Sequence, residues 1–258
     1  MLILISNDDG IESAGLHALR QIGQELAGPE GEVWVCAPEQ NHSGAGHSLS
    51  LNEPVRIRQV DERAFAVRGT PTDSVIMGVH HVLKDRKPDL LLSGINRGSN
   101  LAEDVTYSGT IAACFEGTLL GIRSIALSQA FGFESKPAPK WQTPIEHAPG
   151  IIRSLLTLDW EPGMLFSLNF PDVEPEKVAG VEVTVQGRRD AGLLSLDERR
   201  DTWGNPYFWL AYRRSRSHAP AGTDLAAIAA GKISVTPLLM DLSYRAVLAS
   251  TRKALGQA

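Results

Sequence analysis

Two adjacent aspartates, Asp8 and Asp9, stand in the stretch "SNDDG", directly after a short apolar run at the start of the chain. Neighbouring carboxylates repel each other, and a buried pair needs a cation, hydrogen-bond donors or a proton. By itself, "NDDG" is typical of an exposed turn with solvated carboxylates. Whether the pair binds a metal ion therefore depends on what the rest of the chain brings to it.

Two further polar loops also follow apolar runs, "PEQNHSGAGHS" (38–48) and "INRGSNLAEDVTYSGT" (95–110). Ligands of open α/β sheets bind beyond the carboxyl ends of the strands, so we expect the three loops to converge. Their carboxylates, hydroxyls and carboxamides suit Mg²⁺, Mn²⁺ or Ca²⁺, whereas no Cys/His spacing suits zinc. The glycines of "SGAG" and "SGT" can present backbone N–H groups to phosphate oxygens. Together the loops predict a metal-assisted site for a phosphate ester.

Other polar side chains carry weaker signals. His42 and His47 flank "SGAG" and could donate to a phosphate or act as an acid, although loop histidines are usually solvated. The pair Arg199 and Arg200, and the run "RRSR" (213–216), are expected to form a solvated face.

Composition sets limits on the partners of the chain. It has 258 residues, 43% hydrophobic content and a formal net charge of -5, so nucleic acid as a polymer is not favoured. Both cysteines, Cys36 and Cys114, lie in apolar stretches and are expected to be buried thiols. Because the sequence shows neither a signal peptide nor a membrane span, we expect a cytoplasmic protein that does not bind membranes.

The first 130 residues alternate between strands and helices. An apolar strand at 2–6, a helix at 13–27 with Ser13 as N-cap, and a strand at 32–37 form a βαβ unit, which predicts a parallel sheet. Thr70, Pro71 and Asp73 are typical of a helix start. The other core elements expected are strands at 89–94, 123–129 and 163–170, and helices from 71, at 108–121 and at 144–158.

Three regions are expected to depart from this core. Residues 55–60 and 64–69 alternate apolar and polar positions and predict a hairpin set off from the main sheet. The segment 130–142 is rich in Pro and Lys, which indicates a loop or boundary. After Pro171 the pattern predicts antiparallel strands within 180–187 and 206–214, a helix and strand within 222–238, and a terminal amphipathic helix within 243–255.

The fold class expected is therefore α/β. A Rossmann-like three-layer core with a mostly parallel sheet (about 1–130 and 144–170) carries a C-terminal β-rich extension (about 171–258). We treat residues 1–258 as one domain and interpret the extension as an oligomerisation element.

Six motifs occur in an order that resembles a known family. They are "SNDDG", "APEQNHSGAG", "GTPTDSV", "SGINRGSN", "YSGT" followed by "AA" and "EG", and "GTDLAAIAAGKISVTPL". The ordered set is similar to that of the SurE family, stationary-phase survival proteins that act as metal-dependent nucleotidases. Each motif is weak alone, but together they span residues 6 to about 242.

The resemblance implies a Rossmann-like fold, a C-terminal part exchanged between subunits in dimers or tetramers, and one divalent cation per subunit, Mg²⁺ or Mn²⁺. It implies metal ligands at Asp8, Asp9, Ser43 and Asn96, with Asp8 and Asp9 also catalytic. It implies a substrate-binding part that comprises Gly44, Asn100, Ser108, Gly109 and Thr110.

The activity expected is hydrolysis of nucleoside 5′-monophosphates to nucleoside and phosphate, with side activity on 3′-nucleotides and polyphosphate. One alternative is a covalent aspartyl-phosphate enzyme, which "NDDG" does not favour because such enzymes separate their two carboxylates by a spacing residue. Another is a non-catalytic nucleotide-binding regulatory module, although no G-x-G-x-x-G follows the first strand.

Overall fold

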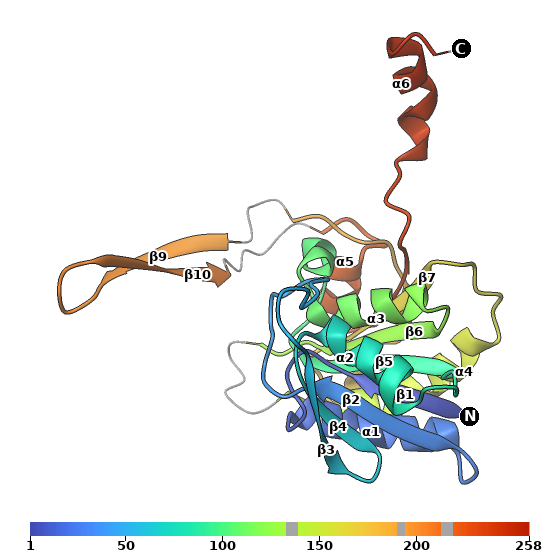
Figure 1. Ribbon diagram of the computed structural model, residues 1–258. Coiled ribbons are helices and arrows are strands. Elements are labelled where there is room, and N and C mark those ends of the chain that lie inside the picture. Colours follow the sequence, from blue (N-terminus) through green and yellow to red (C-terminus); the bar gives the residue numbers. More distant parts are fainter. Residues whose placement is uncertain (133–138, 190–193, 213–218, 258) are drawn as a thin grey trace.

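The computed structural model describes residues 1–132, 139–189, 194–212 and 219–257. Their main feature is a nine-stranded, mostly parallel sheet with the strand order β3-β4-β2-β1-β5-β6-β7-β11-β8 (Figure 1). Its strands are β1 (Leu2–Ser6), β2 (Glu32–Pro38), β3 (Arg56–Asp61), β4 (Ala64–Arg68), β5 (Leu90–Arg97), β6 (Arg123–Gln129), β7 (Met164–Phe170), β8 (Val181–Val183) and β11 (Ile233–Leu239). A separate antiparallel ribbon consists of β9 (Leu194–Arg200) and β10 (Pro206–Tyr212).

Helices cover both faces of the sheet (Figure 1). The α-helices are α1 (Ala14–Ala27), α2 (Pro71–Met77), α3 (Gly109–Leu119), α4 (Gln142–Leu156), α5 (Asp224–Ala229) and α6 (Leu248–Ala254). A π-helical turn, η1 (Gly78–Val82), continues α2, and 3₁₀ turns occur at η2 (Ala102–Thr106), η3 (Pro175–Lys177) and η4 (Arg245–Val247). The helices α1 and α4 share one core with the sheet, and α2 and α3 lie on the other face. The expected three-layer α/β fold is confirmed.

The first strand shows why the sheet forms. It pairs in parallel with β2 and with β5, so both of its edges are hydrogen-bonded. Ile3 and Ile5 pack into the core beneath α1, whereas Leu4 packs into the core on the α2 side. A continuous apolar run is what a strand buried on both faces requires.

Cys36 and Cys114 are both buried and free, as expected, and burial raises the pKa of the Cys36 thiol to about 12.

Helix starts follow the sequence signals. The Ser13 side chain accepts a hydrogen bond from the Leu16 N–H at the start of α1. At α2, Thr70 accepts from the Asp73 N–H while Asp73 accepts from the Thr70 N–H, which is a complete capping box with Pro71 at the first helical position. Both N-cap predictions are confirmed.

Two predictions about strands are wrong. The hairpin at 55–60 and 64–69 is part of the main sheet, because β4 pairs in parallel with β2. Ala64 and Ala66 pack beneath α1 while Val67 packs on the other face, so β4 is buried on both sides despite its alternating sequence. Strand β8 was expected to pair antiparallel but pairs in parallel with β11. Strand β9 was not anticipated, because its charged sequence "LSLDERR" has no apolar periodicity.

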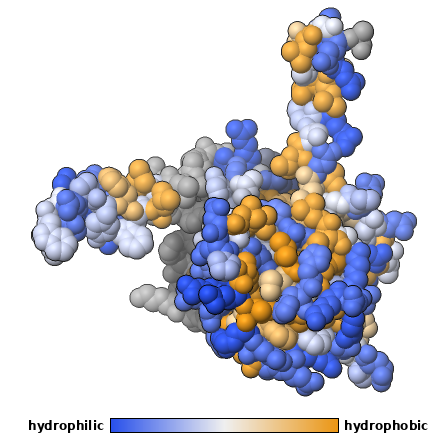
Figure 2. Space-filling model, in the orientation of Figure 1, coloured by the Kyte–Doolittle hydropathy of each residue, from blue (hydrophilic) through white to orange (hydrophobic). Residues whose placement is uncertain are grey.

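The C-terminal extension has two roles in the fold. Strand β11 pairs antiparallel with β7 and so completes the main sheet. The β9–β10 ribbon and α6 instead project from the body (Figure 1) and carry exposed apolar side chains (Figure 2). Most of the expected loop at 130–142 (residues 133–138) and the "RRSR" run lie outside the described residues. Within the described ranges, no helix is long and apolar enough to cross a membrane.

Candidate active site

The parallel strands bring three loops to the same edge of the sheet. The carboxyl ends of β1, β2 and β5 lie side by side because β1 pairs in parallel with both neighbours. Asp8 and Asp9 follow β1, and Ser43 lies in the loop after β2. Asn96 is the second-last residue of β5. The expected convergence of the loops at one edge follows from this pairing.

Asp8 is the buried member of the pair, with 4% of its surface exposed. The Thr110 hydroxyl donates to its Oδ1 at 2.5 Å. A Cβ atom at position 109 would lie 2.7 Å from the Asp8 Cβ and 3.1 Å from the Pro71 Cγ. Only a glycine therefore lets the start of α3 approach the Asp8 carboxylate this closely.

Replacing Gly109 by alanine is therefore expected to push the start of α3 away from Asp8 and to lower kcat/KM about tenfold, since misplaced groups lose their transition-state contacts. Phosphate release from a nucleoside monophosphate measures the effect. The matched control is Gly150→Ala in α4, where an added Cβ has nothing within 4 Å, so that variant should keep its activity and gain helix stability. Equal activity in both variants would contradict the steric assignment.

Asp9 is only partly buried and is oriented by two different loops. Its Oδ1 accepts from the Asn41 side-chain amide at 3.3 Å, and its Oδ2 accepts from the Arg97 backbone N–H at 3.0 Å. The Asn41 Oδ1 in turn accepts from the Ser43 N–H at 2.8 Å. Asn41 thus connects two expected metal ligands. The signal in the sequence for this role of Asn41 is its place just before "SGAG".

The turn that holds the aspartates depends on a second residue missed from the sequence. The Asn7 side chain donates to the Gly10 carbonyl at 2.9 Å and to the Ser13 hydroxyl at 2.7 Å. It also accepts from the Gly10 N–H at 3.3 Å. Asn7 therefore joins the turn to the N-cap of α1, and its position within "NDDG" was the available signal.

The charge of this carboxylate pair has no basic partner. Among the described residues, no ion pair involves Asp8 or Asp9. Burial raises the pKa of Asp8 to about 6; the Thr110 hydrogen bond opposes this shift, and the charge of Asp9 adds to it. A buried carboxylate beside a second one, with no lysine or arginine to neutralise it, suits a hard divalent cation.

The remaining expected ligands fit a cation of this kind. Asn96 donates its Nδ2 to the Gly98 carbonyl at 2.9 Å, which leaves its carbonyl oxygen as the atom for a metal. Ser43 is exposed. Nowhere in the described ranges do three or more His, Cys, Asp or Glu side chains gather as a metal cluster. The expected donor set is two carboxylates with the neutral oxygens of Ser43 and Asn96. Such a set suits Mg²⁺ or Mn²⁺ rather than zinc.

The expected substrate-binding residues differ in their surroundings. Ser108 is the N-cap of α3 and accepts from the Ile111 N–H at 3.1 Å, so its hydroxyl proton is available to a ligand. Gly44 is exposed and has a φ of 79°. Asn100 is largely buried and donates its Nδ2 to Ser128 at 2.8 Å, while its backbone N–H donates to Asn169. Its side-chain nitrogen is thus already engaged in holding the loop.

The two loop histidines have different environments. The His42 backbone N–H donates to the Asp8 carbonyl at 2.8 Å, which ties the loop after β2 to the aspartate turn. The His47 ring lies 3.0 Å from the Glu116 carboxylate on α3 and contacts the Phe115 ring. His42 is therefore the histidine attached directly to the aspartate turn.

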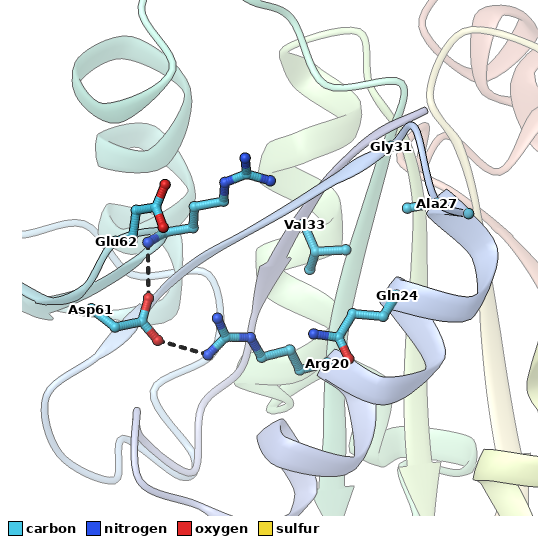
Figure 3. Close-up of a pocket in the computed structure, with 9 residues that line it drawn as sticks. Arg20, Gln24, Ala27, Gly31, Val33, Asp61 and Glu62 are labelled. Carbon is cyan, nitrogen blue, oxygen red and sulfur yellow. Dashed lines mark hydrogen bonds and ion pairs between the residues drawn. The ribbon is translucent and has the colours of Figure 1, made fainter.

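A pocket of about 470 Å³ lies at the opposite edge of the sheet (Figure 3). Arg20 and Gln24 of α1 line it together with Asp61 at the end of β3 and Glu62 in the turn that follows. Arg20 pairs with Asp61 at 2.8 Å. Gly31 and Val33 place it at the amino end of β2. None of the expected site residues lines this pocket, so it is separate from the candidate active site.

Comparisons with known proteins identify the family of the chain. The family model described as "Survival protein SurE" matches residues 3–192. The chain is 56% identical to the 5′-nucleotidase SurE of Methylorubrum populi over 94% of each chain. It is 55% identical to the 5′-nucleotidase SurE of Methylobacterium sp. (strain 4-46) over 99% of this chain and all of that one. The crystal structure of the SurE protein from Aquifex aeolicus superposes with a TM-score of 0.83, at 37% identity over 99% of this chain and 100% of that chain.

Proposed function

The chain belongs to the SurE family and is an enzyme of the 5′-nucleotidase type, and we propose that it hydrolyses nucleoside 5′-monophosphates with the help of one divalent cation. The observation that carries the proposal is the buried Asp8 carboxylate. It lies beside Asp9 and against the start of α3, with no basic side chain paired to it in the described residues. A cation and a phosphate group together would satisfy this arrangement.

The proposed metal ligands are Asp8, Asp9, Ser43 and Asn96. A bound Mg²⁺ or Mn²⁺ supplies Lewis acidity toward a phosphate oxygen and toward water. Asn41 and the Arg97 N–H hold the Asp9 carboxylate in one orientation. Thr110 does the same for Asp8. Held this way, the carboxylates need no reorganisation when the metal binds, which favours tight binding.

The proposed phosphate-binding part is the start of α3 with the loop before it. The first N–H groups of a helix have no partner within the helix and favour an anion. Ser108, Gly109 and Thr110 stand at this end, and we assign them to the non-bridging phosphate oxygens together with Gly44 and Asn100. These contacts stabilise charge as the bond to the ribose oxygen breaks. The products are a nucleoside and orthophosphate.

The metal requirement is tested by phosphate release from a panel of nucleoside 5′- and 3′-monophosphates. Treatment with a chelator is expected to remove nearly all turnover, because no basic residue of the described ranges forms an ion pair with the two aspartates. Adding Mg²⁺ or Mn²⁺ should restore it. Full activity in excess chelator would overturn the metal requirement, whereas tight binding without release under either metal would favour the regulatory-module alternative. Side activity on polyphosphate, the preferred metal and a cytoplasmic location stay predictions.

We also propose that the chain forms a homodimer or homotetramer through its C-terminal extension. The ribbon exposes Leu196, Trp209 and Leu210 by 57% to 70%. Tyr244 and Leu255, which flank η4 and α6, are exposed by 72% and 69%. Exposed apolar side chains on projecting elements are typical of an interface. Light scattering should give a mass of two or four times 27.9 kDa. A monomeric mass at micromolar concentration would contradict this.

A further inference from the structure

The placement of β4 within the main sheet brings an additional residue to the active-site edge. Because β4 runs parallel to β2, its last residue, Arg68, lies at the same edge as the aspartate turn. A pocket of about 250 Å³ opens there, between the end of β4 and the loop after β2. Its lining residues are Glu39, Gln40, His42, Val67 and Arg68.

This pocket adjoins the candidate active site through its own lining. The His42 N–H donates to the Asp8 carbonyl at 2.8 Å, and the neighbouring Asn41 side chain binds Asp9. The Glu39 N–H donates to the Val67 carbonyl at 2.7 Å and so joins the loop after β2 to the end of β4. A ligand with one group at Asp8 and Asp9 therefore has the Arg68 pocket beside it.

A second pocket of about 470 Å³ continues along the hairpin and shares Glu39 and Arg68 with the first. Arg56, Arg58 and Ala66 also line it. The two pockets thus adjoin at Glu39 and Arg68, and together they are here called the arginine groove. All three of its arginines are exposed.

The charges in the arginine groove are unbalanced. Arg56 stands directly opposite Arg68 in the antiparallel register of β3 and β4, which puts both side chains on the same face. Like charges in directly opposite positions destabilise a sheet. Arg58 pairs with Glu39 at 3.2 Å, whereas no ion pair in the described part of the chain involves Arg56 or Arg68.

Protection of the sheet edge does not explain both arginines. Charged side chains on an edge strand prevent edge-to-edge association, and β3 is an edge strand, which accounts for Arg56. Arg68 lies on β4, which is hydrogen-bonded to β2 on one side and β3 on the other. An anion bound between Arg68 and Arg56 would offset the repulsion of their like charges.

We propose that the arginine groove binds a phosphate group other than the one that is hydrolysed. Guanidinium groups match the oxygens of a phosphate in a planar, bidentate fashion. The group is either a second phosphate of the substrate, as in a nucleoside 3′,5′-bisphosphate, or a free phosphate anion. The assignment of the anion site is independent of the proposed function, whereas its use by a substrate rests on that function.

Binding of inorganic diphosphate to the metal-free protein tests the anion site without any turnover. We expect calorimetry in excess chelator to show that Arg56→Gln and Arg68→Gln each weaken binding about fivefold, because each removes a charge-assisted contact. The matched control, Arg153→Gln, removes the same charge from α4, where Arg153 pairs with Glu25, and should bind like the wild type. Equal affinities in all four proteins would overturn the proposal even if hydrolysis is confirmed.

A charge-reversal variant separates a binding role from a structural one. Arg56→Glu creates an opposite-charge pair with Arg68 across the two strands and is expected to raise Tm while it abolishes diphosphate binding. If this variant is more stable than the wild type but no longer binds diphosphate, the loss of binding cannot be due to unfolding. Unchanged diphosphate binding by this variant would also overturn the proposal.

A kinetic comparison then distinguishes the two sources of phosphate. If the substrate supplies it, kcat/KM for a nucleoside 3′,5′-bisphosphate relative to the 5′-monophosphate should fall about tenfold in Arg68→Gln and stay constant in Arg153→Gln. If this ratio is unchanged while diphosphate binding is lost, the groove binds a free anion. If neither diphosphate binding nor this kcat/KM ratio changes in the arginine variants, the anion site is overturned. If no variant and no wild-type protein turns over any nucleotide, only the proposed function is contradicted.

Discussion

Replacing Asp8 by asparagine is expected to lower kcat/KM on the order of a thousandfold, which corresponds to about 4 kcal/mol of transition-state stabilisation. The substitution keeps the shape of the side chain and the acceptor for the Thr110 hydroxyl. It removes the negative charge with which this buried residue would hold the cation. The measurement is phosphate release under saturating Mg²⁺ or Mn²⁺, with the affinity for the metal determined in parallel.

The matched control for this variant is Asp61→Asn. Asp61 is also an aspartate at the end of a strand, but it lies in the pocket at the opposite edge of the sheet and pairs with Arg20. That variant should keep its activity, because it touches none of the expected ligands. Near-normal turnover by Asp8→Asn would remove the proposed metal site. A large loss in both variants would instead point to a general effect of lost charge.

The sequence predicted the part of the site that depends on local signals. The apolar run before "NDDG", the N-cap at Ser13 and the capping box at Thr70 each arise within a few residues, so they can be read without tertiary information. The convergence of the loops after β1, β2 and β5 followed from one general property, the common direction of parallel strands.

What the sequence did not predict depends on long-range pairing. Strand β4 looked like part of an isolated hairpin because its residues alternate, yet two alanines let it pack beneath α1 and pair with β2. Arg68 reaches the active-site edge only through that pairing. In the same way, the contact of Gly109 with Asp8 joins residues about a hundred positions apart, and "SGT" alone gives no reason why a glycine is needed there.

The same Asp8→Asn substitution is expected to stabilise the metal-free protein at neutral pH. Burial and the neighbouring Asp9 raise the pKa of Asp8 from 3.8 to about 6, so the folded protein disfavours the ionised form that the unfolded chain adopts. Above pH 6 this costs about 3 kcal/mol of folding stability. Asparagine carries no charge to be buried, and Tm in excess chelator at pH 7.5 should rise by about 5 °C.

The sign of this effect depends on pH and on the metal. Below the unfolded pKa of 3.8 the carboxyl group is protonated in both states, so the difference in Tm should shrink as the pH falls from about 6 to about 4. With Mg²⁺ or Mn²⁺ present the order should reverse, because the ion stabilises only the folded protein that binds it. A metal-free Asp8→Asn variant less stable than the wild type at pH 7.5 would contradict the prediction. The metal-free wild type is therefore less stable because it buries the same negative charge with which it binds the metal.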